Sequence, residues 1–274
     1  MDIGLIDYLA NRGDSFFHRA APIHKIIFVV FVLTSIVITD NLTLLISTYL
    51  ILTALVILTR LPFVRIISIA AYPAIFALLF ALAAWNGNWT RSGIIVFKAL
   101  SAALTMTLLI VTTPYPSVFA AISPFLPRML VEGLFLTYRS LFILLELMGN
   151  LIRALRLRGG LSPRLYTKNI ANFASGIGLL LVRGLDLSER LYGVMKIRGY
   201  GGKMTQEFDI KNSGRKDFIP VAIGFLILLV SLVLRFQSGF DRYSLYILTI
   251  SVFFVLSAFS FCSIYGNRGA SWKN

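Results

Sequence analysis

Glu146-Leu-Met-Gly-Asn-Leu-Ile-Arg-Ala-Leu-Arg-Leu-Arg-Gly159 is repeated forty residues later as Asp186-Leu-Ser-Glu-Arg-Leu-Tyr-Gly-Val-Met-Lys-Ile-Arg-Gly199. In both copies an acidic residue comes first, and leucines and their helical neighbours recur at three- and four-residue steps. This spacing predicts two helices, each with one apolar face. Each copy closes on a basic residue, an aliphatic residue, arginine and glycine, which is typical of a helix C-terminus because glycine adopts positive φ without a steric penalty. Two similar basic helix tips on one chain predict two similar sockets on a partner.

The composition around these two copies is that of a membrane protein. The chain is 57% hydrophobic and 14% charged, with a mean hydropathy of +0.81. Several apolar runs are long enough to cross a bilayer, which takes about 20 helical residues. The single cysteine, Cys262, excludes a disulfide framework and a zinc cluster. No small-residue cleavage site follows the first apolar run, so we expect no cleavable signal peptide.

The order of apolar and polar stretches predicts an all-α polytopic membrane protein with about six transmembrane helices and a cytoplasmic region of amphipathic coupling helices. The N-terminal membrane region is expected over residues 1–112, the coupling region over 113–216 and the C-terminal membrane region over 217–274. Prolines break the chain between 113 and 127, and two long helical patterns follow at 128–158 and 166–198. The expected membrane helices cover residues 24–39, 42–59, 66–85, 92–112, 218–234 and 243–264.

The distribution of basic residues predicts the orientation. With both termini, the 60–65 loop and the 113–216 region inside, these segments hold 22 of the 26 lysines and arginines. Because basic residues favour the cytoplasmic side, we expect a multi-pass protein of the cell membrane with both termini in the cytoplasm. Lys98 lies within a span, near enough to its outer end for the side chain to reach the lipid headgroups. Whether 128–158 spans the membrane or lies along it stays open.

The motifs of several chemistries are missing. The chain has no Gly-x-x-x-x-Gly-Lys-Ser/Thr loop, and Gly201-Gly202-Lys203 is followed by methionine, so we expect no nucleotide site. His18, His24 and Cys262 have no spacing known for a metal site. Glu132 and Glu146 are fourteen residues apart on one helix, about 21 Å by helix rise, which is too far for joint acid–base catalysis. We therefore expect no catalytic residue, cofactor or metal site.

Several of these residues resemble a known family, the transmembrane T components of energy-coupling factor (ECF) transporters, and most closely the cobalt/nickel-type (CbiQ-like) members. The similarity runs over most of residues 1–203. It rests on Thr112-Thr-Pro114, Leu126-Pro127 and Tyr138-Arg139, and above all on the two helix ends, which resemble the family's paired Ala-Arg-Gly motifs. The chain departs from that pattern at Leu157 and Ile197, where the family often has a small residue. The two apolar runs after 217 make a longer tail than the family leads us to expect.

The resemblance implies a membrane scaffold in a four-part importer. Two cytoplasmic ATP-binding cassette ATPase subunits would bind the two arginine-tipped helices, and a small membrane subunit would capture the substrate. The residues expected to bind the ATPases are Ala154, Arg156, Leu157, Arg158, Gly159, Met195, Lys196, Ile197, Arg198 and Gly199. The chain would be non-catalytic, without a bound cofactor and without affinity for nucleic acid.

Other functions remain as alternatives. Cobalt or nickel is inferred from the style of the motifs alone, so a T component serving vitamin uptake stays open, as does the use of a dedicated or a shared ATPase module. A secondary transporter working without ATP belongs to a different class. Such transporters usually carry ionisable residues or broken helices at the membrane midplane. Here the spans hold only Lys98, which argues against that class.

Overall fold

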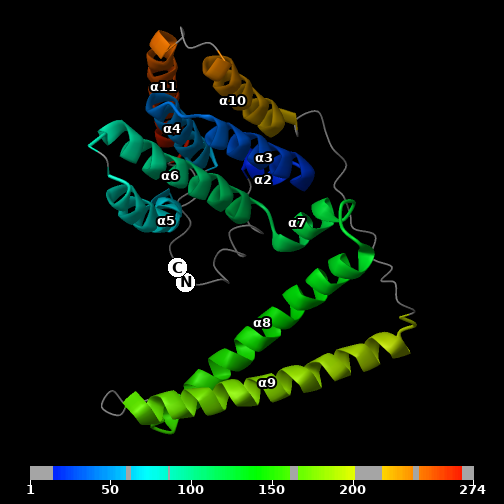
Figure 1. Cartoon of the computed structure of the whole chain (residues 1–274). Coiled ribbons are helices and arrows are strands. Elements are labelled where there is room, and N and C mark those ends of the chain that lie inside the picture. Colours follow the sequence, from blue (N-terminus) through cyan, green and yellow to red (C-terminus); the bar gives the residue numbers. More distant parts are fainter. Residues whose placement is uncertain are drawn as a thin grey trace. The chain divides into compact units, whose positions relative to one another are not determined.

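The computed structural model describes residues 15–59, 63–85, 87–160, 166–200, 218–236 and 241–266 of the 274-residue chain, and every regular element in these ranges is helical (Figure 1). The expectation of an all-α fold is confirmed. The helices are α2 (Phe16–Arg19), α3 (Pro22–Ile38), α4 (Leu42–Leu58), α5 (Phe63–Ala83), α6 (Trp89–Thr112), α7 (Tyr115–Ile122), α8 (Arg128–Leu157), α9 (Tyr166–Ile197), α10 (Phe218–Phe236) and α11 (Asp241–Gly266).

These helices fall into two compact units. The first unit takes both ends of the chain, Met1–Ala121 and Ile210–Asn274, and the second takes Ile122–Asp209. Helices α8 and α9, which end in the repeated motifs, make up the second unit, and the other helices belong to the first. The second unit is therefore an insertion in the first along the sequence.

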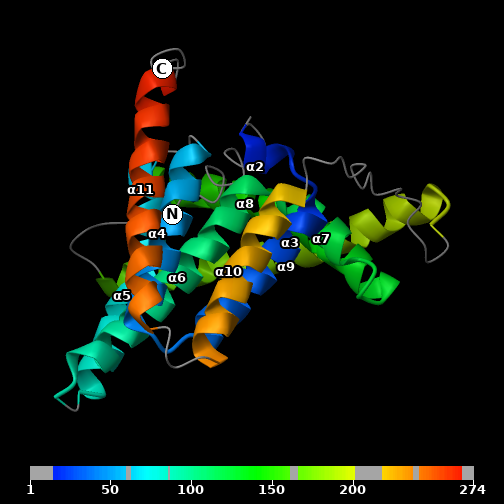
Figure 2. The same ribbon diagram turned by 90° about the horizontal axis from the view of Figure 1, so that it is seen from above.

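The first unit is a bundle in which segments far apart in sequence are neighbours. Helix α10 packs on α3, α11 packs on α4, and α6 packs against α5, α4 and α3 (Figure 2). The buried core comes mainly from α3, α4 and α6. Its most deeply buried side chains include Phe28, Val32, Leu45, Leu52, Leu104 and Leu108.

Membrane-spanning helices are evident from length and composition. Within the described ranges, four helical segments are long and apolar enough to cross a bilayer, and three shorter apolar helices accompany them. Because several apolar helices of this kind occur on one chain, it is a membrane protein. The four are Ile66–Ala83, Trp89–Thr112, Asn169–Ile197 and Phe218–Arg235, and the shorter ones are Pro22–Ile38, Leu42–Leu58 and Tyr246–Ala258. Helix α9, expected as a coupling helix, thus also meets the length and hydropathy needed to span.

The tight turn between α3 and α4 gathers charges from three elements. Asp40 in this turn accepts from Lys98 Nζ of α6 at 3.0 Å and from Arg235 Nη1 of α10 at 3.0 Å. Lys98 also donates to the Val37 carbonyl, and Arg235 to the Ile38 carbonyl. Lys98 was expected to reach lipid headgroups, but in the structure its ammonium lies on a carboxylate because the α3–α4 turn packs beside α6. The hydrogen bond from Lys98 is the main reason why the pKa of Asp40 is lowered from 3.8.

Another lysine, Lys25, is buried and lies at the C-terminal end of α6. Lys25, in the first turn of α3, is 2% exposed. Its ammonium donates to the carbonyl of Thr112 at 2.9 Å and to that of His18 at 3.3 Å. A cation at the C-terminus of α6 suits the negative end of the helix dipole and satisfies a terminal carbonyl. Lys25 thereby joins α3 to the Thr112-Thr-Pro114 segment, where α6 ends.

Helix α10 lies unusually close to α3. A Cβ added at Gly224 would lie 3.2 Å from both the Cα and the carbonyl oxygen of Phe28, so only glycine fits there without displacement of a backbone. Further along, the hydroxyls of Thr39 and Ser231 lie 2.5 Å apart, and Ser231 donates to the Ser35 carbonyl. The C-terminal helices, which the resemblance did not account for, are thus part of the bundle.

Some of the expectations fall outside the described residues. These are residues 1–14 of the N-terminal lead-in, most of the basic 60–65 loop, the turn at Pro163, the connector from 201 to 216 with Gly201-Gly202-Lys203, and the last residues of the chain. The side chain of Cys262 is likewise not described.

Candidate partner-docking tips

The two repeated motifs end their helices in the same backbone geometry. At the first, the Gly159 N–H donates to the Arg156 carbonyl and the Gly160 N–H to the Leu155 carbonyl, at 3.2 and 2.9 Å. At the second, the Gly199 and Tyr200 N–H groups make the same bonds to Lys196 and Met195 at 3.1 and 3.0 Å. The two glycines have φ of 68° and 82°. Each end is therefore a Schellman motif, and the predicted glycine stop with positive φ is confirmed.

The two ends also present their side chains alike. Residues 155–160 and 195–200 show the same order of exposure: a half-buried residue, four exposed ones and another half-buried one. Leu157 is 89% exposed and Ile197 is 87% exposed, each one residue before the motif's arginine. We call these two segments tip 1 (155–160) and tip 2 (195–200). Each tip offers a branched aliphatic side chain beside an exposed guanidinium, Arg158 or Arg198.

The residues predicted to bind a partner lie at these tips or directly before them, and the two sets match. Arg156, Leu157, Arg158 and Gly159 are all exposed, as are their counterparts at tip 2. Met195 is half-buried like its counterpart Leu155, and the carbonyl of each is used in a Schellman motif. Ala154, directly before tip 1, is exposed like its counterpart Val194.

Helices α8 and α9 form an antiparallel hairpin in which a glycine of α9 lies against a leucine of α8. A Cβ added at Gly176 would lie 2.7 Å from Leu151 Cδ2, whereas one at Gly178 would meet nothing within 4 Å. The small-residue run that includes both glycines was read as a place where helices approach closely, and the contact is made by Gly176 of that pair. Nearby, Asn172 Nδ2 donates to the Gly160 carbonyl at 3.0 Å, which ties tip 1 to α9.

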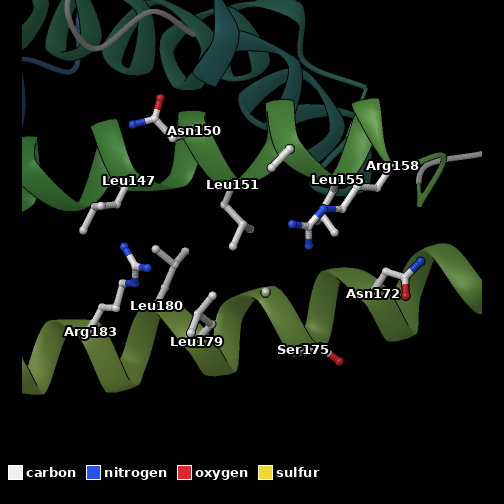
Figure 3. Close-up of a pocket in the computed structure, with 12 residues that line it drawn as sticks. Leu147, Asn150, Leu151, Leu155, Arg158, Asn172, Ser175, Leu179, Leu180 and Arg183 are labelled. Carbon is white, nitrogen blue, oxygen red and sulfur yellow. The ribbon is translucent and has the colours of Figure 1, made fainter.

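A groove of about 520 Å³ runs along this hairpin. Leucines of both helices form its floor, and Arg158 and Arg183 extend into it from α8 and α9 respectively (Figure 3). Arg158 is exposed where the groove reaches tip 1, so its guanidinium is accessible to a partner that approaches this end. Among the described residues, no three His, Cys, Asp or Glu side chains come together as metal ligands.

The two tips lie at opposite ends of the hairpin (Figure 1). Tip 1 is beside Asn172, and tip 2 follows Ile197 at the end of α9. From Asn172 to Ile197, α9 advances by 25 residues. At about 1.5 Å of rise per residue, the tips are separated by about 38 Å. A single binding site could not receive both tips at that distance, so docking of both tips would require two separate sites.

One pair at tip 2 was missed by the sequence analysis. The Tyr200 hydroxyl donates to Glu132 Oε2 of α8 at 3.0 Å, and Glu132 is 8% exposed. This hydrogen bond raises the pKa of the Tyr200 phenol above 10.0, so the hydroxyl stays the donor at neutral pH. Glu132 had been considered only with Glu146, which is exposed. A signal was present, because a carboxylate in the first turns of an apolar helix needs a partner when buried.

Comparison with known proteins agrees with this geometry. A model of the CbiQ family, described as a cobalt transport protein, matches residues 13–208. The chain belongs to this family. The match includes both tips, the hairpin and α3 to α7, and it ends before α10. No curated protein matches the chain. As a CbiQ family member with several apolar helices, the chain is a membrane transport component, and the suspected relationship to cobalt-type T components is confirmed at the level of the family.

Proposed function

We propose that this CbiQ family member is the transmembrane scaffold of an ABC-type ECF importer. Each tip docks into one of two ATPase subunits, and the α8–α9 hairpin transmits their motion to a separate membrane subunit that binds the substrate. The observation that carries the proposal is the equivalence of the two tips, which share one backbone motif, one exposure pattern and one arginine position. Two equal tips about 38 Å apart by helix rise fit two equal subunits of a dimeric partner.

The chemistry of a tip defines the socket. A guanidinium has five donors in a rigid plane, so its site offers carboxylates or backbone carbonyls in a matching arrangement. Leu157 and Ile197 lie beside the arginines and are almost fully exposed, so each socket also has an apolar pocket wide enough for a branched side chain. Burying such a side chain contributes about 1.5–3 kcal/mol.

The proposal also assigns orientation and substrate. Although α9 is long and apolar enough to span, the proposal places both termini, α8 and α9 on the cytoplasmic side, because a spanning α9 would put the two tips on opposite faces of the membrane. The concentration of basic residues in these segments and the cytoplasmic location of the ATPases support this orientation. The proposed substrate is cobalt or nickel, and the family description, cobalt transport protein, supports cobalt of the two. The chain itself is non-catalytic, so the purified chain alone should not hydrolyse ATP.

The experiment is a pull-down of the ATP-binding cassette subunits that copurify with the full chain. Arg158→Glu and Arg198→Glu should each weaken association at least tenfold, because losing one partner of a buried charge pair costs about 2–5 kcal/mol. The double variant should abolish it. Arg158→Lys and Arg198→Lys should be intermediate, since lysine keeps the charge and loses the planar fork.

Arg190→Glu is the matched control, because Arg190 is exposed on α9 two turns before tip 2. It should leave association close to that of the parent chain. Equal losses from Arg190→Glu and the tip variants would mean a diffuse basic surface, and two-socket docking would be wrong. Metal uptake by cells with the same variants should follow the pull-down.

A further inference from the structure

The residue after each motif's glycine holds its tip to the opposite helix of the hairpin. At tip 1 this residue is Gly160, whose carbonyl accepts from Asn172 of α9. At tip 2 it is Tyr200, whose hydroxyl donates to Glu132 of α8. The two tips are therefore equivalent in their backbone, and each is joined to the opposite helix by a hydrogen bond, but the groups that make the bond differ.

The difference follows from the space at each position. A Cβ added at Gly160 would lie 3.2 Å from Asn172 Nδ2 and 3.2 Å from the Leu155 carbonyl oxygen, so a tyrosine would displace the bond that holds tip 1. At tip 2 the corresponding side chain is half-buried and reaches back to the first turns of α8. Along the antiparallel pair, Leu151 opposes Gly176, Leu144 opposes Gly184 and Glu132 opposes Tyr200. The pairing thus continues from the hairpin's closed end to tip 2.

Near tip 2 the packing of α9 on α8 is partial. In the last turns of α9, Leu187, Leu191 and Met195 are half-buried, whereas Leu185, Tyr192 and Val194 are largely exposed, at 67%, 58% and 48%. The Schellman motif fixes the backbone from Met195 to Tyr200, and the bond to Glu132 then fixes the direction in which this rigid segment faces.

We infer that Tyr200 and Glu132 are positioning residues for Arg198, and that Asn172 has the same role for Arg158. The inference rests on the docking role proposed for the tips. The hydrogen bond at each tip orders that tip before docking, so the ATPase meets a preformed surface. Tyr200 should therefore affect docking of tip 2 only, and Asn172 should affect docking of tip 1 only.

The test is a pull-down of the ATP-binding cassette subunits that copurify with the full chain, carried out in two backgrounds. In Arg158→Glu, association depends on tip 2, and adding Tyr200→Phe should weaken it about tenfold, as expected for losing a hydrogen bond to a charged group. In Arg198→Glu, association depends on tip 1, and the same change should have no further effect. Asn172→Leu should weaken association in the Arg198→Glu background and have no further effect in the Arg158→Glu background.

Conservative variants separate positioning from folding. Glu132→Gln keeps an oxygen acceptor for the phenol and should retain association. Glu132→Leu should weaken association as much as Tyr200→Phe does, and the two changes together should weaken it no further. Glu146→Leu, on the same helix and exposed, and Tyr192→Phe, on α9 and exposed, serve as controls that should have no effect.

Equal effects of Tyr200→Phe in both backgrounds, or no effect in either, would overturn the positioning role. If Arg198→Glu weakens association while Tyr200→Phe does not, the inference fails and the docking role stands. If Arg158→Glu and Arg198→Glu both leave association intact, the docking role itself fails.

Discussion

Replacing Gly176 by leucine should open the α8–α9 hairpin at the end that carries tip 2. A Cβ at this position would lie 2.7 Å from Leu151 Cδ2, and ordinary contact begins at 3.4 Å. Rotation of the Leu151 side chain relieves part of this clash, so the Cβ alone forces the helices apart by at most about 0.7 Å. The bond from Asn172 to the Gly160 carbonyl holds the closed end as a pivot. Measured along α9 from Asn172, the clash at Gly176 is four residues away, a rise of about 6 Å. Ile197, at the end of α9, is 25 residues away, a rise of about 38 Å.

The ratio of these two distances converts the full separation of about 0.7 Å into an opening of about 4 Å at tip 2, which is the upper limit. This exceeds what a hydrogen bond of 3.0 Å tolerates, so the contact between Tyr200 and Glu132 should break as well. Gly178→Leu is the matched control, because it has the same helix propensity but its Cβ would meet nothing within 4 Å.

The opening can be measured by double electron–electron resonance in an otherwise cysteine-free full chain. Spin labels at Met129 on α8 and Val194 on α9 are suitable, because both side chains are exposed, at 85% and 48%. Gly176→Leu should lengthen the label distance relative to Gly178→Leu, by up to about 4 Å from the lever arm set by helix rise. Combining Gly176→Leu with Leu151→Ala should restore it. If the two leucine variants give the same distance, Gly176 is not the point that sets the spacing.

The first unit supports three further predictions, each measured by the melting temperature of the purified full chain in detergent. Gly224→Ala should destabilise by about 1–3 kcal/mol through overpacking against α3, while Gly149→Ala, with nothing within 4 Å, should not destabilise. Lys25→Met should cost about 1.5–3 kcal/mol, because a buried charged hydrogen bond to the end of α6 is lost. Asp40→Asn should lower stability near pH 7, and this difference should vanish as pH falls through the folded-state pKa of Asp40, which lies below 3.8; a difference that persists there would contradict the ion-pair explanation.

Periodicity and helix-end chemistry were sufficient to predict the helices themselves. The expected 128–158 and 166–198 appear as Arg128–Leu157 and Tyr166–Ile197, and the glycine after each arginine adopts positive φ. These features are local: a basic last turn followed by glycine ends a helix in almost any surroundings. The same reasoning therefore located both tips from the repeat alone.

The pairing of helices was beyond the reach of a single sequence. Asp40 and Arg235 are 195 residues apart, and Tyr200 and Glu132 are 68 apart, and nothing in either local pattern indicates the other. Lys98 was predicted to reach the lipid headgroups, because its distance from the end of the helix permits that. Its observed partner, the carboxylate of Asp40, comes from a turn that only the fold brings beside α6. The choice of Gly176 over Gly178 as the contact likewise depends on the rotation of α9 toward α8.

The packing of α10 on α3 and of α11 on α4 has a consequence for biosynthesis. About 160 residues separate the end of α4 from the start of α10, and at 5–20 residues per second their synthesis takes roughly 10–30 s. During that interval α3 and α4 are already made, while the faces that will hold α10 and α11 have only lipid or chaperones beside them. Synthesis that terminates after tip 2 would give a chain with both arginine tips and an unfinished bundle. Under the proposed docking role, such a product would compete for ATPases without transporting anything.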